Sequence, residues 1–512
     1  MHMPGFLNGE SACALIDSSF EITSKAQELI HHVTFAAVLA LSSVSRATST
    51  TTITRHVSSI APRTPSSPLP AADFSVPITA SAPRSKAKKS LMRALKESQA
   101  AQAGSNFTTV LAGSDFDEEY LTNVKFGEQE FMLIVDTGSS DTWAPQVGYA
   151  CFNLDNKPVS QSQCAFGSAG FNSSASTTFT VDPGTNFNIE YADGEFLSGT
   201  VGFETVTVGG LAVKQQEIGV VNKAAWDGDG FNSGLIGFAS PNLTFVFNGT
   251  NPNDDDTQIP YNPFFYSAVQ QGLVSHPFLS VALDRGSFAA ENSSDLDQNL
   301  GFISFGGIAP VDVISSTAIT VPIQGYDAAT FTPKNGSTGV TYFYYSVDVE
   351  LMSFTGNHEI FGTTNNIILD SGTTLDYVPT DVADAFAAAF DPPAVKDDDF
   401  GVYTVVCTAT VPEFTVTIGG VTFTVDPADN LFPLGIQDDK GNDLCASGTF
   451  DGGPSTGAEG NVFILGDTFL HNVVATFNIE TDEITLTQRA PYTSGGSDVK
   501  RRAPSSVRRR SV

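Results

Sequence analysis

The sequence predicts a mostly β protein built from two pseudo-symmetric lobes. Helix signals are scarce, whereas Gly, Phe, Thr and Val are abundant and turn residues recur throughout the body of the chain. An apolar run, Phe131–Val135, ends in Asp136-Thr-Gly, and the same design returns in the second half of the chain as Ile367-Ile-Leu-Asp370-Ser-Gly. The 512 residues, 41% of them hydrophobic, suffice for a large core or two lobes.

The two repeated motifs predict a paired-carboxylate site. Each apolar strand would deliver an aspartate, Asp136 or Asp370, at its end. Two such carboxylates face to face in a shielded cleft cannot both ionise cheaply, so they share a proton. The ionised carboxylate can take a proton from water while the protonated one hydrogen-bonds a substrate carbonyl. This pattern indicates amide hydrolysis with no metal and no other cofactor.

The residues that follow each aspartate suit this chemistry. Gly138 and Gly372 allow a tight turn that offers backbone N–H groups to the carboxylates. The hydroxyls of the neighbouring residues can hold the pair coplanar, and they belong to Thr137, Ser139, Ser371 and Thr373.

Charge is distributed very unevenly along the chain. The net charge is −31, yet the stretch 101–497 contains only nine Lys and Arg residues, at positions 125, 157, 214, 223, 285, 334, 396, 440 and 489. So acidic a body is unsuited to nucleic acid or an anionic membrane. Two interpretations remain open. The charge could serve solubility, or the protein could work in acid, where the charge is largely neutralised.

Cysteines and sequons are typical of a secreted glycoprotein. Cys13 falls in the expected leader, and four cysteines remain in the body. Of three possible connectivities, the nearest-neighbour one, Cys151–Cys164 with Cys407–Cys445, places one bridge in each lobe. No CxxC motif or His cluster suggests a metal site. The glycosylation candidates are Asn106, Asn172, Asn242, Asn248, Asn292 and Asn335.

The ends of the chain carry targeting and processing signals. Residues 1–47 are interpreted as a leader whose apolar core, 33–41, suits a signal peptide. The atypical acidic extension before this core suggests a misassigned start codon or a translated intron. Residues 48–103 are interpreted as a propeptide. Its Ser/Thr/Pro-rich part, 48–83, is expected to lack stable structure, and its basic part, 84–102, could form a helix that blocks an acidic cleft. The alternative for the basic part is a solvated linker.

The body is expected to divide into an N-terminal lobe, 104–310, and a C-terminal lobe, 311–490. Short helices are predicted at Phe264–Gln271 and at Pro379–Phe390, the second capped by Thr380. The tail, 491–512, is basic and is expected to be disordered. It has no apolar end, so no stable membrane anchor is expected.

At these motifs the chain resembles the pepsin-like aspartic proteases, particularly the secreted fungal ones. The resemblance covers about residues 107–490 and rests on four segments: 136–143, 370–374, Gly234-Leu-Ile-Gly-Phe238 and Ile464-Leu-Gly-Asp467. It implies a bilobal acid-protease fold with the active cleft between the lobes. It also implies that Asp136 and Asp370 are catalytic, with Ser139 and Thr373 as their outer hydroxyl partners.

The family's flap hairpin resembles Ile189-Glu-Tyr191-Ala192-Asp193-Gly194. The resemblance implies that Tyr191 lies over the substrate and that Trp143 hydrogen-bonds it. Ala192 departs from the family's usual Gly. Asp193 resembles an acidic residue that favours Lys before the scissile bond in some fungal members, although it could simply stabilise the turn. Cys407–Cys445 resembles the family's C-terminal disulfide, whereas Cys151–Cys164 closes a longer loop than the corresponding loop of pepsin.

The expected protein is therefore an acid endopeptidase, secreted as a zymogen or sent to a vacuole. It would act as a monomer on extended polypeptide substrates. One alternative is a catalytically inactive relative that binds peptides or glycans, but such relatives lose an Asp, a motif Gly or the flap Tyr. A second alternative is a sugar kinase, because Leu369-Asp-Ser-Gly-Thr-Thr374 resembles a phosphate-binding motif of that superfamily. The sequence lacks the α/β alternation that a kinase needs.

Overall fold

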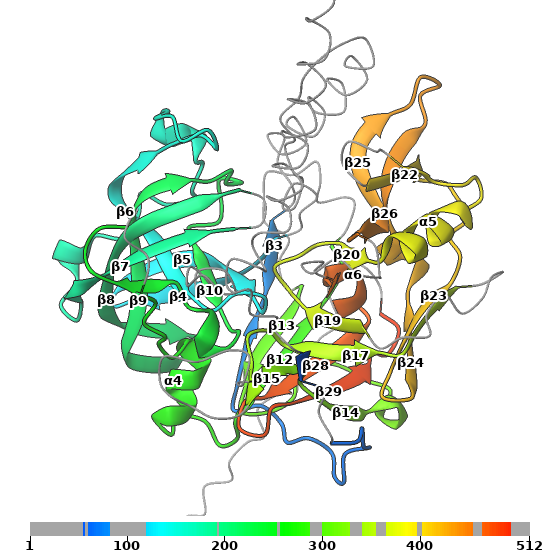
Figure 1. Cartoon of the computed structure of the whole chain (residues 1–512), viewed down its shortest axis with the longest axis horizontal. Coiled ribbons are helices and arrows are strands. Elements are labelled where there is room, and N and C mark those ends of the chain that lie inside the picture. Colours follow the sequence, from blue (N-terminus) through cyan, green and yellow to red (C-terminus); the bar gives the residue numbers. More distant parts are fainter. Residues whose placement is uncertain are drawn as a thin grey trace, which may run out of the picture.

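The computed structural model is mostly β, with two lobes that lie side by side (Figure 1). It describes residues 55–56, 60–81, 119–191, 194–252, 257–286, 300–327, 340–354, 365–396, 402–453 and 463–492. The predicted leader, the basic part of the propeptide and the tail from residue 493 onward lie outside these residues. The expectation that the tail 491–512 is disordered is wrong for Tyr492, whose hydroxyl donates to the His471 carbonyl at 3.0 Å. The bilobal, mostly β prediction is confirmed.

A nine-stranded sheet forms the N-terminal lobe, in the order β11-β7-β8-β9-β6-β10-β5-β4-β3. Its strands are β3 (Thr79–Ser81), β4 (Glu119–Phe126), β5 (Gln129–Asp136), β6 (Thr142–Cys151), β7 (Thr180–Glu190), β8 (Phe196–Val208), β9 (Leu211–Ala225), β10 (Leu235–Gly237) and β11 (Val246–Asn248). At the end of β8, over Thr205–Val208, half-buried Thr and buried Val alternate, as expected for a strand with one face on the core. The turn into β9 uses Gly209 and Gly210, whose φ values of 55° and 92° favour glycine.

The C-terminal lobe contains an eight-stranded sheet and a three-stranded one. The larger sheet runs β17-β19-β27-β20-β26-β22-β21, with β25 paired to β26, and the smaller runs β18-β23-β24. Their strands are β17 (Ser346–Val349), β18 (Leu351–Phe354), β19 (Asn365–Leu369), β20 (Asp376–Val378), β21 (Val395–Lys396), β22 (Val402–Val406), β23 (Phe414–Ile418), β24 (Val421–Val425), β25 (Leu431–Gln437), β26 (Asp443–Asp451) and β27 (Phe463–Leu465). A further small sheet joins β1 (Arg55–His56), β15 (Gly325–Asp327) and β16 (Val340–Thr341).

A six-stranded sheet connects the two lobes, in the order β14-β29-β28-β12-β13-β2. Its strands are β2 (Phe74–Pro77), β12 (Phe278–Leu283), β13 (Gly301–Phe305), β14 (Ile319–Pro322), β28 (Val473–Asn478) and β29 (Glu483–Gln488). Strands from both sides of the expected boundary at residue 310 share this sheet, which lies below and between the lobes in Figure 1. The two halves of the site therefore stand on a common base.

Helices are few and short among the described residues. They include α4 (Phe264–Gln270), α5 (Thr380–Ala388) and α6 (Asp467–Leu470). The predictions of helices at 264–271 and 379–390 are confirmed. The predicted Thr380 cap is wrong, because Pro379 occupies the cap position and the Thr380 hydroxyl instead donates to Asp451 at 2.6 Å.

The expectation that residues 48–83 lack stable structure is wrong for residues 60–81. There β2 pairs with β13 and β3 pairs with β4. Val76 and Ile78 are buried in the main core, and the Arg63 guanidinium forms an ion pair with Glu483. The abundance of Ser, Thr and Pro concealed a short segment with enough β-branched and aromatic residues to join existing sheets.

A buried polar network crosses the base of the two lobes. Arg285 donates to both carboxylate oxygens of Asp429, at 2.6 and 2.7 Å. The His471 ring lies between Asp429, at 3.1 Å, and the Tyr120 hydroxyl, at 2.6 Å. Burial raises the pKa of Asp429, but His471 and Arg285 outweigh burial and lower that pKa to about 2. His471 is therefore part of a structural network.

Candidate active site

The two motif aspartates lie at equivalent places in the two lobes. Asp136 is the last residue of β5, and Asp370 directly follows β19. In each lobe a short apolar strand runs parallel to the strand that bears the aspartate: β10 beside β5, and β27 beside β19. The two short strands overlap the segments Gly234–Phe238 and Ile464–Asp467 on which the family resemblance rests. Each active loop is thus supported by a buried strand on its flank.

Each carboxylate is held by the loop that follows it. Asp136 Oδ1 accepts from the backbone N–H of Gly138 at 2.6 Å and of Ser139 at 3.2 Å, while the Ser139 hydroxyl donates to Oδ2. Asp370 Oδ1 accepts from the Gly372 N–H at 2.8 Å, and Oδ2 accepts from the Thr373 hydroxyl at 2.7 Å. The two arrangements are nearly the same, as expected from a duplicated design.

The inner hydroxyl residues, Thr137 and Ser371, do not hold the carboxylates coplanar as the sequence predicts. They contact no carboxylate in the described hydrogen bonds and instead join the two loops across the lobe junction. The Thr137 hydroxyl donates to the Leu369 carbonyl at 3.0 Å and accepts from the Ser371 N–H at 3.0 Å. Ser371 reciprocates, donating from its hydroxyl to the Val135 carbonyl at 2.8 Å and accepting from the Thr137 N–H at 3.2 Å. These reciprocal bonds fix the distance between the loops.

The motif glycines are required by the partner aspartate rather than by a left-handed turn. A Cβ atom added to Gly138 would lie 2.4 Å from Cγ of Asp370. One added to Gly372 would lie 2.7 Å from Oδ1 of Asp136. Real Cβ atoms essentially never approach other atoms so closely. Each glycine therefore makes room for the carboxyl group of the other lobe.

The pair has the electrostatics of two carboxyls that share a proton. Burial raises the pKa of Asp136 well above its usual value, and the charge of Asp370 and a hydrogen bond to the Asp370 carboxyl raise it further. The Ser139 hydroxyl and the Gly138 N–H act in the opposite direction but do not cancel these effects. A proton is therefore retained by the pair under conditions in which an isolated aspartate would lose it.

The flap tyrosine and the motif tryptophan meet beside the pair. Tyr191 follows β7 at a turn in which its carbonyl accepts from Gly194 N–H at 3.0 Å. Trp143, fully buried on β6, donates from Nε1 to the Tyr191 hydroxyl at 2.8 Å. Burial, followed by the Asp136 charge, raises the pKa of Tyr191 well above its usual value. The tyrosine stays neutral and lies within electrostatic range of the pair. Ala192 and Asp193 lie outside the described residues.

Two further aspartates, Asp141 and Asp376, are fully buried near the site. Asp141 accepts from the Tyr261 hydroxyl at 2.8 Å and the Phe245 N–H at 3.0 Å, and burial raises its pKa to about 7. Asp376 accepts from the Gly466 N–H at 2.9 Å, and burial raises its pKa well above the usual value. Their degree of burial had no signal in the sequence.

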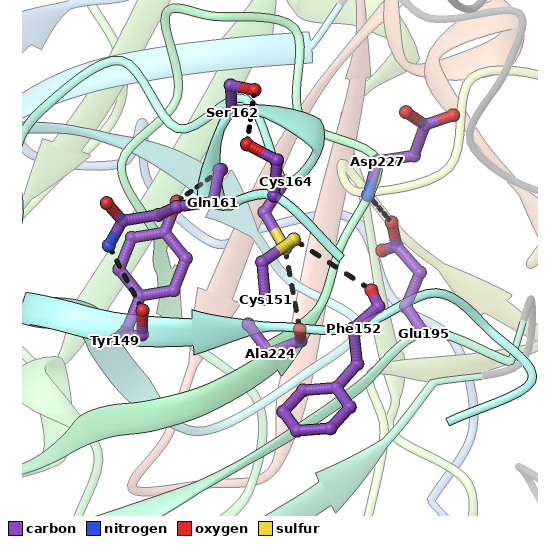
Figure 2. The surroundings of a disulfide bond; sticks show 10 residues. Tyr149, Cys151, Phe152, Gln161, Ser162, Cys164, Glu195, Ala224 and Asp227 are labelled. Atoms are coloured by element: carbon purple, nitrogen blue, oxygen red, sulfur yellow. Dashed lines mark hydrogen bonds between the residues drawn. A yellow bond between two sulfur atoms is a disulfide. The ribbon is translucent and has the colours of Figure 1, made fainter. Parts of the chain in front are cut away.

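Both expected disulfides are present. Cys151–Cys164 lies in the N-terminal lobe (Figure 2) and Cys407–Cys445 joins β26 to the end of β22 in the C-terminal lobe. Among the sequons, Asn172 and Asn248 are exposed, whereas half-buried Asn242 donates from Nδ2 to the Tyr342 carbonyl at 3.0 Å. A glycan on Asn242 would have to displace that bond. Asn106, Asn292 and Asn335 lie outside the described residues.

No group of three His, Cys, Asp or Glu residues in the described part of the chain is arranged to hold a metal ion. Within the same part, no helix is both long and apolar enough to cross a bilayer.

Comparisons with known proteins agree with the fold. A family model described as eukaryotic aspartyl protease matches residues 119–489. The chain is 38% identical over 394 residues to a "probable aspartic-type endopeptidase" of Aspergillus fumigatus, covering 76% of this chain and 81% of the relative. It is 29% identical over 378 residues to rhizopuspepsin of Rhizopus chinensis, covering 72% and 78%. A crystal structure of an aspartic proteinase from Irpex lacteus superimposes with a TM-score of 0.54 at 20% identity, covering 81% and 97%.

The two β lobes on a shared sheet have the fold of the solved aspartic proteinase, and the family match puts the chain in the pepsin-like class of aspartic endopeptidases. The chain belongs to the eukaryotic aspartyl protease family. The sugar-kinase alternative is wrong, because both the family and the β architecture exclude it.

Proposed function

We propose that the protein is an endopeptidase that works in acid, with Asp136 and Asp370 as its catalytic residues. The observation that carries the proposal is the cross-lobe geometry of the two loops. Thr137 and Ser371 tie the loops together, and Gly138 and Gly372 let each carboxyl approach the opposite loop. The raised pKa of Asp136 supports a shared proton.

The chemistry is a single addition of water to a peptide carbonyl. The ionised carboxylate takes a proton from a water molecule as the water oxygen forms a bond to the carbonyl carbon. The protonated carboxyl donates its proton to the carbonyl oxygen, so the product of addition is a neutral diol. The leaving nitrogen then receives a proton from the pair as the C–N bond breaks, and one diol hydroxyl returns its proton to the pair as the carbonyl of the new carboxylic acid reforms. The pair is thereby restored with one proton.

Substrates are expected to lie as extended chains between the pair and Tyr191. The Trp143 hydrogen bond holds the tyrosine hydroxyl toward the site. The enzyme is proposed to act as a monomer outside the cell or in a vacuole, an environment consistent with its two disulfides.

Residues 48–103 are proposed to be a propeptide that is removed on activation. The described part of this segment is attached to the body of the protein by the pairing of β2 with β13, by the pairing of β3 with β4 and by the Arg63–Glu483 ion pair. Protonation of carboxylates in acid would weaken such ion pairs and free the basic part of the segment. Acid activation followed by N-terminal sequencing tests this, and a mature chain that retains residues within 48–103 would contradict it.

Hydrolysis of casein or denatured haemoglobin at about pH 3 to 5 tests the main proposal. We expect cleavage that a statine-type peptide blocks. No cleavage by the acid-treated protein at any pH, with the peptide still bound, would favour the inactive binding relative instead.

Replacing Gly372 by alanine is expected to lower kcat/KM by about 10²-fold, because the new Cβ would displace the Asp136 carboxyl by roughly an ångström. The matched control is Gly184→Ala, since a Cβ at Gly184 meets nothing closer than 4.0 Å. The measurement is peptide hydrolysis at acidic pH, with thermal unfolding to verify the fold. Equal activity in the two variants would contradict the cross-lobe role of Gly372.

A further inference from the structure

The loop 226–234, which joins β9 to β10, carries an aromatic side chain that none of the motifs accounts for. The Trp226 ring stacks on Phe166, with ring centroids 6.0 Å apart and planes 10° apart. It also meets Trp143 edge-on at 5.2 Å and Tyr191 edge-on at 6.0 Å. Trp226 is thus in contact with both members of the flap hydrogen bond, Trp143 and Tyr191. Edge-to-face pairs of this kind are favourable beyond the area they bury.

The loop itself is held in one conformation by its own polar groups. Trp226 donates from Nε1 to Asn232 Oδ1 at 3.1 Å. Asp229 Oδ1 accepts from the backbone N–H groups of Phe231 at 2.7 Å and Asn232 at 2.8 Å. The Asp229 bonds hold the backbone around Asn232, and the Nε1–H bond to Asn232 restrains the indole ring, because rotating the ring would break it.

The loop is also bonded to the base of the flap. Asp227 N–H donates to Glu195 Oε1 at 2.6 Å, and Glu195 stands immediately before β8. The Glu195 carbonyl in turn accepts from the Tyr191 N–H at 2.8 Å. Figure 2 draws the Asp227–Glu195 bond in the surroundings of the Cys151–Cys164 disulfide. Two independent contacts, one aromatic and one polar, therefore connect loop 226–234 to the flap residue Tyr191.

The segment that follows the Cys151–Cys164 disulfide also contacts loop 226–234. Gly228 N–H donates to the Cys164 carbonyl at 3.2 Å, and Gly167 N–H donates to the Asn232 carbonyl at 2.7 Å. A Cβ at Gly228 would lie 2.5 Å from Cys164 O, and one at Gly167 would lie 2.1 Å from Phe231 O. Both glycines thus allow the two segments to touch through their backbones. Phe166 lies only two residues after Cys164, so these backbone contacts keep its ring stacked on Trp226.

We propose that Trp226 and Phe166 are positioning residues for the flap tyrosine, and that the Cys151–Cys164 disulfide holds them in place. The inference rests on the proposed function, since it concerns how Tyr191 meets a substrate. Without Trp226, one edge of the Tyr191 ring loses its partner, and the side chain can leave the Trp143 hydrogen bond. A substrate must then order the tyrosine as it binds, at a cost in affinity. Once the substrate is bound, the aspartate pair is unchanged.

The first test is a comparison of Trp226→Ala with Trp226→Phe in steady-state peptide hydrolysis at acidic pH. We expect Trp226→Ala to raise KM by about tenfold, with kcat within about twofold of the wild type, the pattern of lost binding common to ground and transition states. Trp226→Phe keeps a ring against Tyr191 and is expected to restore most of the affinity. A merely structural role would lower kcat through loss of folded enzyme and leave KM unchanged, and that result would overturn the proposal.

The second test uses the other disulfide as a matched control. Cys151→Ser with Cys164→Ser is expected to raise KM as Trp226→Ala does, whereas Cys407→Ser with Cys445→Ser is expected to leave KM unchanged. Equal KM changes in the two double variants would overturn the role of the first disulfide. If Trp226→Ala does not fold, Phe166→Ala replaces it, and an unchanged KM in that variant would overturn the proposal.

Fluorescence gives a readout that is independent of turnover. The chain has two tryptophans, so Trp226→Phe leaves Trp143 as the sole indole. We expect its emission to change when a statine-type peptide binds, because the peptide would lie against Tyr191, its hydrogen-bond partner. Unchanged emission on saturation would contradict the proposed coupling. If the wild type itself neither cleaves nor binds such peptides, the proposed function fails. If the wild type cleaves them and the Trp226 and Phe166 variants have the same KM as the wild type, only the inference about these two residues is rejected.

Discussion

Replacing Asp136 by asparagine is expected to lower peptide hydrolysis by about 10⁴-fold, the upper end of what positioned acid–base groups contribute. An amide cannot take a proton from water, and it cannot share one with Asp370. The fold should survive, because burial raises the pKa of Asp136 and its charged form is unfavourable in the folded protein. The measurement is kcat/KM at acidic pH together with the thermal unfolding temperature.

The matched control for this variant is Asp155→Asn. The Asp155 side chain is exposed, with an ion pair to Lys157 at 3.1 Å that is open to solvent. We expect the control to keep full activity. Retention of activity in Asp136→Asn would overturn the catalytic assignment, and a large drop in its unfolding temperature would show that the lost activity reflects the fold instead.

Stability is expected to decrease as the pH rises from about 4 to 7, with Asp141 as a main cause. Burial raises the pKa of Asp141 to about 7, whereas the same carboxyl in the unfolded chain ionises near pH 4. Between these values the folded protein holds a proton that the unfolded chain releases, so rising pH favours unfolding. One such group corresponds to a loss on the order of 4 kcal/mol. Burial also raises the pKa of Glu217 to about 7 and that of Asp482 to about 6, which adds to the trend.

Urea unfolding at pH 4 and at pH 7 measures this effect, with the Asp136→Asn background used to prevent self-digestion. We expect Asp141→Asn to reduce the pH dependence, because the amide resembles the protonated carboxyl and takes up no proton. Asp155→Asn should leave the dependence unchanged. Below pH 4 we expect stability to fall again. The pKa of Asp429 is lowered to about 2, so its stabilising ion pairs are lost as the pH falls toward 2. Equal stability of the background protein at pH 4 and 7 would contradict the role of the buried carboxyls.

Much of the fold could be predicted because its signals are local. Apolar runs bounded by turn residues mark β5 and β19, and Gly-Gly pairs mark the turns after β8 and β23. The segment Phe74–Pro77 was missed, because its place in a sheet depends on pairing with β13, more than two hundred residues away. The amino-acid composition of 48–83 as a whole is dominated by Ser, Thr and Pro, so it hides a strand of only four residues.

The hydroxyl residues of the site illustrate the same limit. Ser139 and Thr373 lie three residues after their aspartates, a local spacing that fits the contacts they make. Thr137 and Ser371 have equally local neighbours but bond to the opposite lobe, 234 positions away in sequence. Only the meeting of the two loops decides which hydroxyl faces a carboxyl and which one joins the lobes.

By itself the sequence determined the mostly β class, the two aspartate motifs and the tyrosine that follows β7. Each of these features is indicated by a strong pattern of residues that are close together in the sequence. The tertiary structure alone decided that Gly138 makes room for Asp370, that Asp141 and Asp376 are fully buried, and that Trp226 lies against Tyr191. The physical reason is the same in each case. Close packing and desolvation depend on atoms brought together from distant parts of the chain, and spacing along a sequence carries no record of them.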